Sequence, residues 1–278
     1  MSGAIAGAPS CQTHVVEALG VGVRIDADAC TPRQFAVIRA AWESADPGVV
    51  PRVVVECAGG LDDDVLLARL SAEVTQEAMR AQRGRLWMLH ASAVALPSGR
   101  VVAFVGPSGM GKTTAAREIG RHHGYVTDET VGIGRNGVVH PLRKPLSVVS
   151  AGTPTKSQCA PSELGLRPLP EGPLTIAALI VLRREGEVGA QGSRLDPLPA
   201  GEALADLALH SSFLSELPRA LRMMLRLMSD VGGVHRRLVR LVVGVVARVG
   251  QGDASELVQQ LAQLQHVVGS QLPARTVG

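Results

Sequence analysis

The sequence predicts an α/β fold, and three features of the 278-residue chain support that prediction. Short apolar runs alternate with amphipathic stretches of helical length, which is the pattern of strands and helices that share one core. One apolar run, residues 101–105, leads through a glycine-rich loop into a helix-forming segment at 112–123. In the last part of the chain, apolar side chains recur every three or four positions, as in helices. We therefore expect a small N-terminal α/β module over residues 1–85, an α/β core over 86–186 and a mainly helical C-terminal region over 187–278.

The N-terminal module is expected to contain two strands and two helices. Residues 15–25 form the first strand, bent at its glycines, and 49–57 form the second. The first helix begins at Thr31-Pro32, because threonine is a favoured N-cap and proline a favoured first residue. The second helix begins at the triplet 62–64, which is Asp-Asp-Asp. We interpret these carboxylates as helix capping rather than as a metal site, because acids in a first turn complement the helix dipole.

The core is organised around a glycine-rich loop and the start of the helix that follows it. This segment consists of Gly106, Pro107, Ser108, Gly109, Met110, Gly111, Lys112, Thr113 and Thr114. The pattern G-x-x-x-x-G-K-T between a strand and a helix is the P-loop motif, in which glycines let backbone N–H groups approach phosphate closely. The N-terminus of the helix adds unpaired donors and the positive end of its dipole. Lys112 is predicted to reach the β- and γ-phosphates of a nucleotide, and the Thr113 hydroxyl to bind Mg²⁺.

A strand is expected over residues 86–96, joined to strand 101–105 by a turn at Pro97-Ser98-Gly99. In a hairpin centred on Ser98, residues whose numbers add up to about 196 face each other. This register places His90 opposite Gly106, at the mouth of the glycine loop. His90 is therefore either a structural histidine or a contact of the phosphates or the reacting hydroxyl, and we weigh these alternatives equally.

A short strand at 125–127, after a helix that ends with Gly124 as its C′ residue, leads into Asp128-Glu129. If this strand runs parallel to 101–105, its acids lie beside the glycine loop, because ligands of open α/β sheets bind at the carboxyl ends of strands. Two such carboxylates can divide the work: one holds Mg²⁺ and the other accepts a proton from an attacking hydroxyl. The alternative is surface capping after a strand.

Residues 132–142 resemble a hairpin with a type I′ turn at Asn136-Gly137. The hairpin delivers Arg143 and Lys144, which either close over bound phosphate or form a solvated edge. Residues 150–173, rich in Gly, Pro, Ser and Thr, are expected to be a lid or binding loop. An apolar run at 174–182 then predicts a buried strand. Further along, 238–249 fit either a strand or a helix, and 255–268 fit a last helix.

The amino-acid composition argues against some classes of binding partner and against a membrane location. A net charge of +3 and an aromatic content of 2% argue against nucleic acid, which is bound by basic surfaces and aromatic stacking platforms. The sequence has no run of 18 uncharged apolar residues, so no membrane span is expected. The first residues also lack the pattern of a secretion signal. We therefore expect a cytoplasmic protein. The four cysteines show no paired spacing and are expected to be buried thiols. A homo-oligomer stays an open alternative.

His90, the loop from Gly106 to Thr113, and Thr127-Asp128-Glu129 together resemble the HPr kinase/phosphorylase family. The nucleotide core of that family is similar to phosphoenolpyruvate carboxykinase. The sequence looks most like the truncated HPr kinase-like relatives, which include lasso-peptide kinases. The resemblance is clear over residues 86–150 and extends to about 185. It implies ATP as the nucleotide, phosphate binding by Lys112, Mg²⁺ binding by Thr113, an Asp128 general base, and His90 near the transferred phosphate.

Two departures limit what the resemblance implies. Glu129 stands where HPr kinases have aspartate, and the interval from the glycine loop to the acids is slightly shorter. The glycine-rich stretch with which those enzymes bind HPr is also not visible here. We therefore expect an ATP- and Mg²⁺-dependent kinase that phosphorylates a hydroxyl group, as on serine. The acceptor is a peptide, a protein segment or a small molecule. The alternatives are an ATP-binding regulatory protein and a nucleoside-triphosphate hydrolase.

Overall fold

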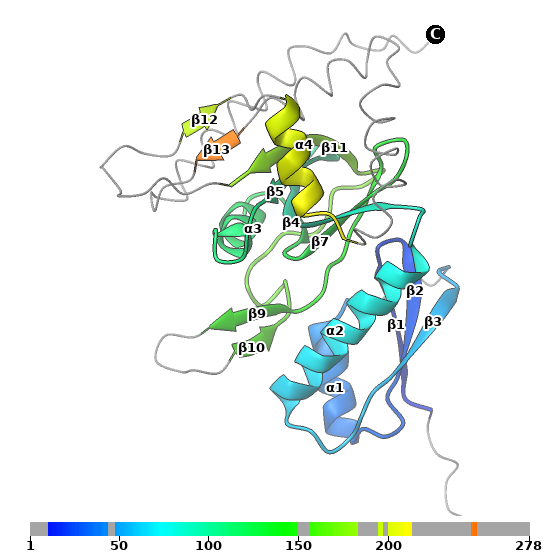
Figure 1. Cartoon of the computed structure of the whole chain (residues 1–278). Coiled ribbons are helices and arrows are strands. Elements are labelled where there is room, and N and C mark those ends of the chain that lie inside the picture. The colour runs from blue at the N-terminus through cyan, green and yellow to red at the C-terminus, as the bar shows by residue number, and fades with distance from the viewer. Residues whose placement is uncertain are drawn as a thin grey trace, which may run out of the picture.

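A computed structural model describes residues 11–43, 48–149, 156–182, 194–196, 200–212 and 246–248 of the chain. The described part is a mixed α/β structure with several sheets and few helices (Figure 1). Its helices are α1 (Pro32–Ala41), α2 (Asp63–Ala81), α3 (Lys112–Gly120) and α4 (Ala200–Leu209). Its strands are β1 (Thr13–Ala18), β2 (Val21–Asp26), β3 (Pro51–Glu56), β4 (Trp87–Ala95), β5 (Arg100–Val105), β6 (Gly124–Thr127), β7 (Thr130–Ile133), β8 (Val139–His140), β9 (Leu146–Val149), β10 (Lys156–Cys159), β11 (Thr175–Val181), β12 (Arg194–Asp196) and β13 (Val246–Arg248).

The first sheet has the strand order β1-β2-β3 and packs with α1 and α2 (Figure 1). Strands β1 and β2 form an antiparallel hairpin, and β3 lies parallel to β2. The prediction of one bent strand over 15–25 is therefore wrong. The chain reverses at Leu19-Gly20, where both residues have positive φ, at 53° and 73°. Both arms of this hairpin bury apolar residues, Val16 and Ala18 on β1 and Val21, Val23 and Ile25 on β2. The two strands therefore look like one apolar run in the sequence.

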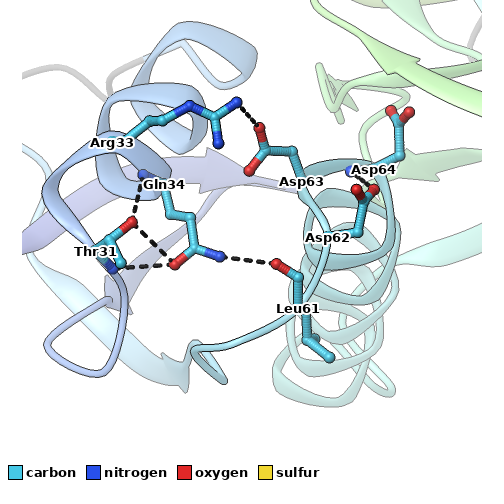
Figure 2. Close-up of polar contacts among 7 residues, drawn as sticks. All are labelled: Thr31, Arg33, Gln34, Leu61, Asp62, Asp63 and Asp64. Carbon is cyan, nitrogen blue, oxygen red and sulfur yellow. Dashed lines mark hydrogen bonds and ion pairs between the residues drawn. The ribbon is translucent and has the colours of Figure 1, made fainter.

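Both N-terminal helices begin as the sequence predicts (Figure 2). The Thr31 hydroxyl accepts a hydrogen bond from the Gln34 amide at 3.2 Å, and the Gln34 side chain accepts one from the Thr31 amide at 3.0 Å. This reciprocal arrangement is a capping box. Asp62 caps α2 by accepting from the Asp64 amide at 3.1 Å. The Asp64 carboxylate also accepts a hydrogen bond from the backbone N–H of Gln158 at 3.0 Å, so α2 is attached to β10.

The large sheet has six strands in the order β11-β5-β4-β7-β8, with β6 also paired to β4. Strand β4 is antiparallel to β5, β6 and β7, while β11 is parallel to β5. The pair Ala91↔Val105 confirms the hairpin register predicted from the turn at Ser98. Alternate residues of β4 face two different cores. One core contains Leu207 of α4, and the other contains Ala115 and Ile119 of α3, so helices cover both faces of the sheet.

Three local predictions in the core need correction. Helix α3 ends at Gly120, and Gly124 begins β6 instead of serving as a helix C′ residue. In the β7–β8 hairpin only Gly137 has positive φ, whereas a type I′ turn needs it at Asn136 as well. The Asn136 side chain accepts instead from the Val138 amide at 3.3 Å, which favours an ordinary turn followed by a left-handed glycine. Within the predicted loop 150–173, residues 156–159 form β10, which pairs with β9.

The C-terminal region is less helical than expected where it is described. Helix α4 matches the predicted helical pattern, but β12 and β13 form a two-stranded antiparallel sheet. Of the ambiguous segment 238–249, the structure describes residues 246–248, which form β13. The helix expected over 255–268 lies outside the described residues. Of the cysteines, Cys30 and Cys57 are buried free thiols as predicted, whereas Cys11 is exposed and Cys159 half-buried. None of the described helices is both long and apolar enough to span a bilayer.

Candidate functional site

The predicted order of strand, glycine loop and helix is present between β5 and α3. Gly109 and Gly111 have φ values of +80° and +93°, a backbone region that residues with a side chain rarely adopt. Gly111 is the N-cap of α3 and provides no side-chain hydrogen bond to it. The first amides of α3 therefore have no capping side chain and can serve an anion placed at the loop.

Lys112 is folded back over the loop. Its residue is only 7% exposed, and its ammonium donates hydrogen bonds to the carbonyl oxygens of Gly106 at 2.6 Å and Pro107 at 3.0 Å. Within the described part of the chain, no carboxylate lies at ion-pair distance from this ammonium. Burial lowers the pKa of Lys112. A desolvated cation held only by carbonyls has the chemistry that suits a bound phosphate, so the residues present fit the predicted ligand.

Strand β4 supplies a residue to this site that the sequence reasoning missed. The Ser92 hydroxyl, which is fully buried, donates to the Lys112 carbonyl at 2.8 Å and so fixes the start of α3 against the sheet. Because side chains alternate along a strand, Ser92 lies on the same face of β4 as His90. Two polar residues at this spacing in an otherwise apolar strand were the available signal.

Two carboxylates follow β6, as predicted, and they differ in environment. The Asp128 side chain is 8% exposed and accepts a hydrogen bond from the Tyr125 hydroxyl at 3.1 Å. The Glu129 side chain is 43% exposed. Burial raises the pKa of Asp128, against the opposing effect of the Lys144 ammonium. A buried carboxylate with a raised pKa is the better proton acceptor of the two.

Lys144 is the counter-ion of this acid pair. Its ammonium lies 2.9 Å from a Glu129 carboxylate oxygen and 3.8 Å from an Asp128 oxygen. Burial alone lowers the pKa of Lys144, but Asp128 and Glu129 outweigh that effect and raise it. With the lysine residue only 6% exposed, the alternative of a solvated edge is wrong for Lys144.

Arg143 has a different set of partners. Its guanidinium makes hydrogen bonds of 2.9 and 2.7 Å to the Glu43 carboxylate, and it also donates to the carbonyl oxygen of Tyr125. The same group lies 5.6 Å from the centre of the Tyr125 ring. These contacts fasten the end of the α1 region to the large sheet, and we do not retain Arg143 among the proposed phosphate ligands.

Sheet topology brings the glycine loop and the acids to one edge. Strands β5 and β6 are both antiparallel to β4, so they run in the same direction, as predicted. Val105 at the end of β5 pairs with Ala91, and Thr127 at the end of β6 pairs with Ala93. The glycine loop and Asp128 therefore leave the sheet at neighbouring levels on either side of β4.

Charges from both the glycine loop and the acid pair act on His90. Partial burial of its ring and the Lys112 ammonium lower the pKa of His90, whereas Glu129 and Asp128 raise it. The residue itself is exposed at the surface. Its imidazole is thus close to the cation of the loop and to the acid pair. The predicted pairing of His90 with Gly106 is wrong, because the β4–β5 ladder ends at Ala91↔Val105 and the His90 amide donates to the His210 carbonyl instead.

Comparisons with known proteins add little to this geometry. No protein-family model and no curated protein matches the chain. A solved structure of the HPr(Ser) kinase/phosphatase from Coxiella burnetii is similar over 40% of this chain and 72% of that chain, with a TM-score of 0.28 and 16% sequence identity. These values leave the residues of the site as the basis for any assignment of function.

Proposed function

We propose that this chain is an ATP- and Mg²⁺-dependent kinase that transfers the γ-phosphoryl group to a hydroxyl acceptor. The observation that supports it best is that two groups leave the same sheet edge: a glycine loop whose carbonyls hold the buried Lys112 ammonium, and a buried carboxylate, Asp128. The sequence pattern around these residues, which resembles the HPr kinase/phosphorylase family, agrees with this proposal. A phosphate-binding loop alone would serve any nucleotide-binding protein; the adjacent base adds the capacity for transfer.

In the proposed reaction, the acceptor hydroxyl oxygen forms a bond to the γ-phosphorus, and the bond from that phosphorus to the β,γ-bridging oxygen breaks. The hydroxyl proton passes to the Asp128 carboxylate, and ADP leaves. Lys112 and the loop amides offset the charge on the β- and γ-phosphates, and His90 orients the phosphate or the acceptor. Catalysis of this kind depends mainly on positioning and on charge stabilisation.

Mg²⁺ would be held by the Thr113 hydroxyl and by Glu129 or Asp128. Among the described residues there is no group of three or more His, Cys, Asp or Glu side chains arranged to hold a metal. That finding fits a magnesium ion whose remaining ligands are nucleotide phosphates and water, as Mg²⁺ usually has. The bound ion would neutralise charge between the β- and γ-phosphates. In the structure, Lys144 offsets the charge of the two carboxylates.

We propose that the acceptor is a peptide terminus, an extended protein segment or a small hydroxylated molecule. The sequence-based hypothesis assigns the segment 150–173 as a lid over that acceptor. The structure changes how this can be tested, since β10 within that segment is fastened to Asp64 of α2 at 3.0 Å. A deletion that includes residues 156–159 would disturb this contact, so a test of the lid should leave β10 intact.

The proposal is tested by ADP release from Mg·ATP in the presence and absence of pooled serine-containing peptides and hydroxylated metabolites. A kinase needs the acceptor; a hydrolase releases ADP without one; a regulatory binding protein releases none. Asp128→Asn and Glu129→Gln then separate the two acids. The first variant should bind nucleotide but lose transfer, and the second should mainly weaken Mg²⁺ affinity. The opposite result would exchange the roles of the two residues.

A further inference from the structure

A segment from the C-terminal region completes the sheet beside the glycine loop. Strand β5 pairs with β4 only as far as Val105 opposite Ala91. Beyond that point, on β4 residues 88–90, the chain that follows α4 takes its place. Leu89 forms an antiparallel bridge with Ser211, the His90 amide donates to the His210 carbonyl at 2.7 Å, and the Ser212 amide donates to the Met88 carbonyl at 2.9 Å.

This segment is held firmly. The Trp87 indole N–H donates to the Ser211 hydroxyl at 2.9 Å, and that hydroxyl donates to the Leu207 carbonyl at 2.7 Å. Both hydrogen bonds are buried. A backbone held on both sides and by an anchored side chain leaves little freedom to the neighbouring residue, His210.

The backbone contacts decide where His210 lies. Leu89 is opposite Ser211 in an antiparallel bridge, and the His90 amide donates to the His210 carbonyl at 2.7 Å, so the backbones of the two histidines are adjacent. His210 also directly follows the end of α4, and its own amide donates to the Asp206 carbonyl at 3.2 Å. Two residues further along β4, the Ser92 hydroxyl contacts the first residue of α3. His210 is half-buried, and it is close enough to Lys112 and His90 that each lowers its pKa, after the larger effect of burial, while Asp206 of α4 raises it.

We propose that His210 donates a hydrogen bond to the γ-phosphate of the bound nucleotide, as a second imidazole beside His90. The inference rests on the proposed function and identifies a phosphate ligand that the glycine-loop motif does not contain. The hydrogen bond from the His90 amide to the His210 carbonyl places His210 next to the β4 residue just beyond the last β4–β5 pair, where the glycine loop begins. The Lys112 ammonium, which is predicted to reach the β- and γ-phosphates, and His90 are both close enough to lower the pKa of His210. A group between those two neighbours lies at the transferred end of the nucleotide. The C-terminal region is then part of the site.

The experiment compares dissociation constants for Mg·ADP and for an ATP analogue with a non-transferable imido bridge between the β- and γ-phosphorus atoms. His210→Ala should weaken binding of the analogue by about ten- to a hundredfold, the range for one hydrogen bond to a charged group, and change ADP affinity less than about twofold. His122→Ala, an exposed histidine after α3, is the matched control and should change neither. His210→Leu keeps a similar volume without a donor and repeats the comparison if the alanine variant unfolds.

The possible outcomes distinguish an error in the role of His210 from an error in the proposed kinase function. Equal weakening of both nucleotides, or of neither, overturns the role of His210, since a merely structural residue would not distinguish a triphosphate from a diphosphate. That result leaves the proposed kinase function standing. A wild-type protein that binds neither nucleotide overturns the proposed function, and this inference with it.

Discussion

Replacing Lys112 with alanine removes the one cation that the structure places within the glycine loop. The ammonium makes two hydrogen bonds, of 2.6 and 3.0 Å, to carbonyl oxygens and would redirect them to phosphate. Loss of a preorganised group that stabilises transition-state charge costs about 3–4 kcal/mol, or roughly a hundred- to a thousandfold in rate. We expect ADP release in the presence of acceptor to fall by that factor. Arg52→Ala, which removes an exposed cation on β3, away from the site, should leave the rate unchanged.

Lys112→Ala should still fold, because it removes one destabilising and one stabilising contribution to the free energy of unfolding. The buried ammonium is costly to desolvate, as the lowered pKa of Lys112 shows, whereas its buried methylene stem stabilises the fold. We expect the free energy of unfolding at pH 7 to change by less than about 2 kcal/mol, a modest effect among single substitutions. ATP should raise the melting temperature of the wild type and not that of the variant.

The sign of the pH dependence adds a further check on the burial of Lys112. A lysine whose pKa is lowered in the folded state binds fewer protons there than in the unfolded chain, so folding becomes more favourable as the pH rises through its folded pKa toward 10.5. The wild type should therefore gain stability relative to Lys112→Ala over that interval, measured by urea unfolding. Equal ATP turnover in the two proteins would refute the assignment of this site.

Three further predictions follow from the site and the first helix. Asp128→Asn should lower transfer by about a hundred- to ten-thousandfold while nucleotide still binds, measured by single-turnover assays; an active variant would exclude this residue as the base. Lys144→Gln should shift the acidic limb of the pH–rate profile to higher pH, because it removes the cation that opposes the rise in the pKa of Asp128, whereas Arg52→Gln, on exposed β3, should shift nothing. Thr31→Ala should cost about 1 kcal/mol of unfolding free energy by breaking the capping box, and Arg33→Ala, on an exposed ion pair, less; urea unfolding curves that show equal losses would contradict the cap's role.

The sequence by itself determined those features that depend on a few neighbouring residues. The capping box at Thr31 joins residues three apart, and the glycine loop depends on backbone conformations that glycine adopts readily. The register between β4 and β5 follows from the short turn that joins them, so Ala91 could be placed opposite Val105 in advance. Local geometry leaves few alternatives over such short distances.

Only the tertiary structure decided which distant segments complete the site. Arg143 and Lys144 are adjacent in sequence, yet one pairs with Glu43, 100 residues away, and the other with the acids after β6. Nothing near β4 in the sequence indicates that His210 occupies the place beside His90. Such pairings depend on which sheet edge is left without a partner and which buried charge lacks a counter-ion. Those requirements exist only once the core has formed, because in the unfolded chain water satisfies every one of these groups.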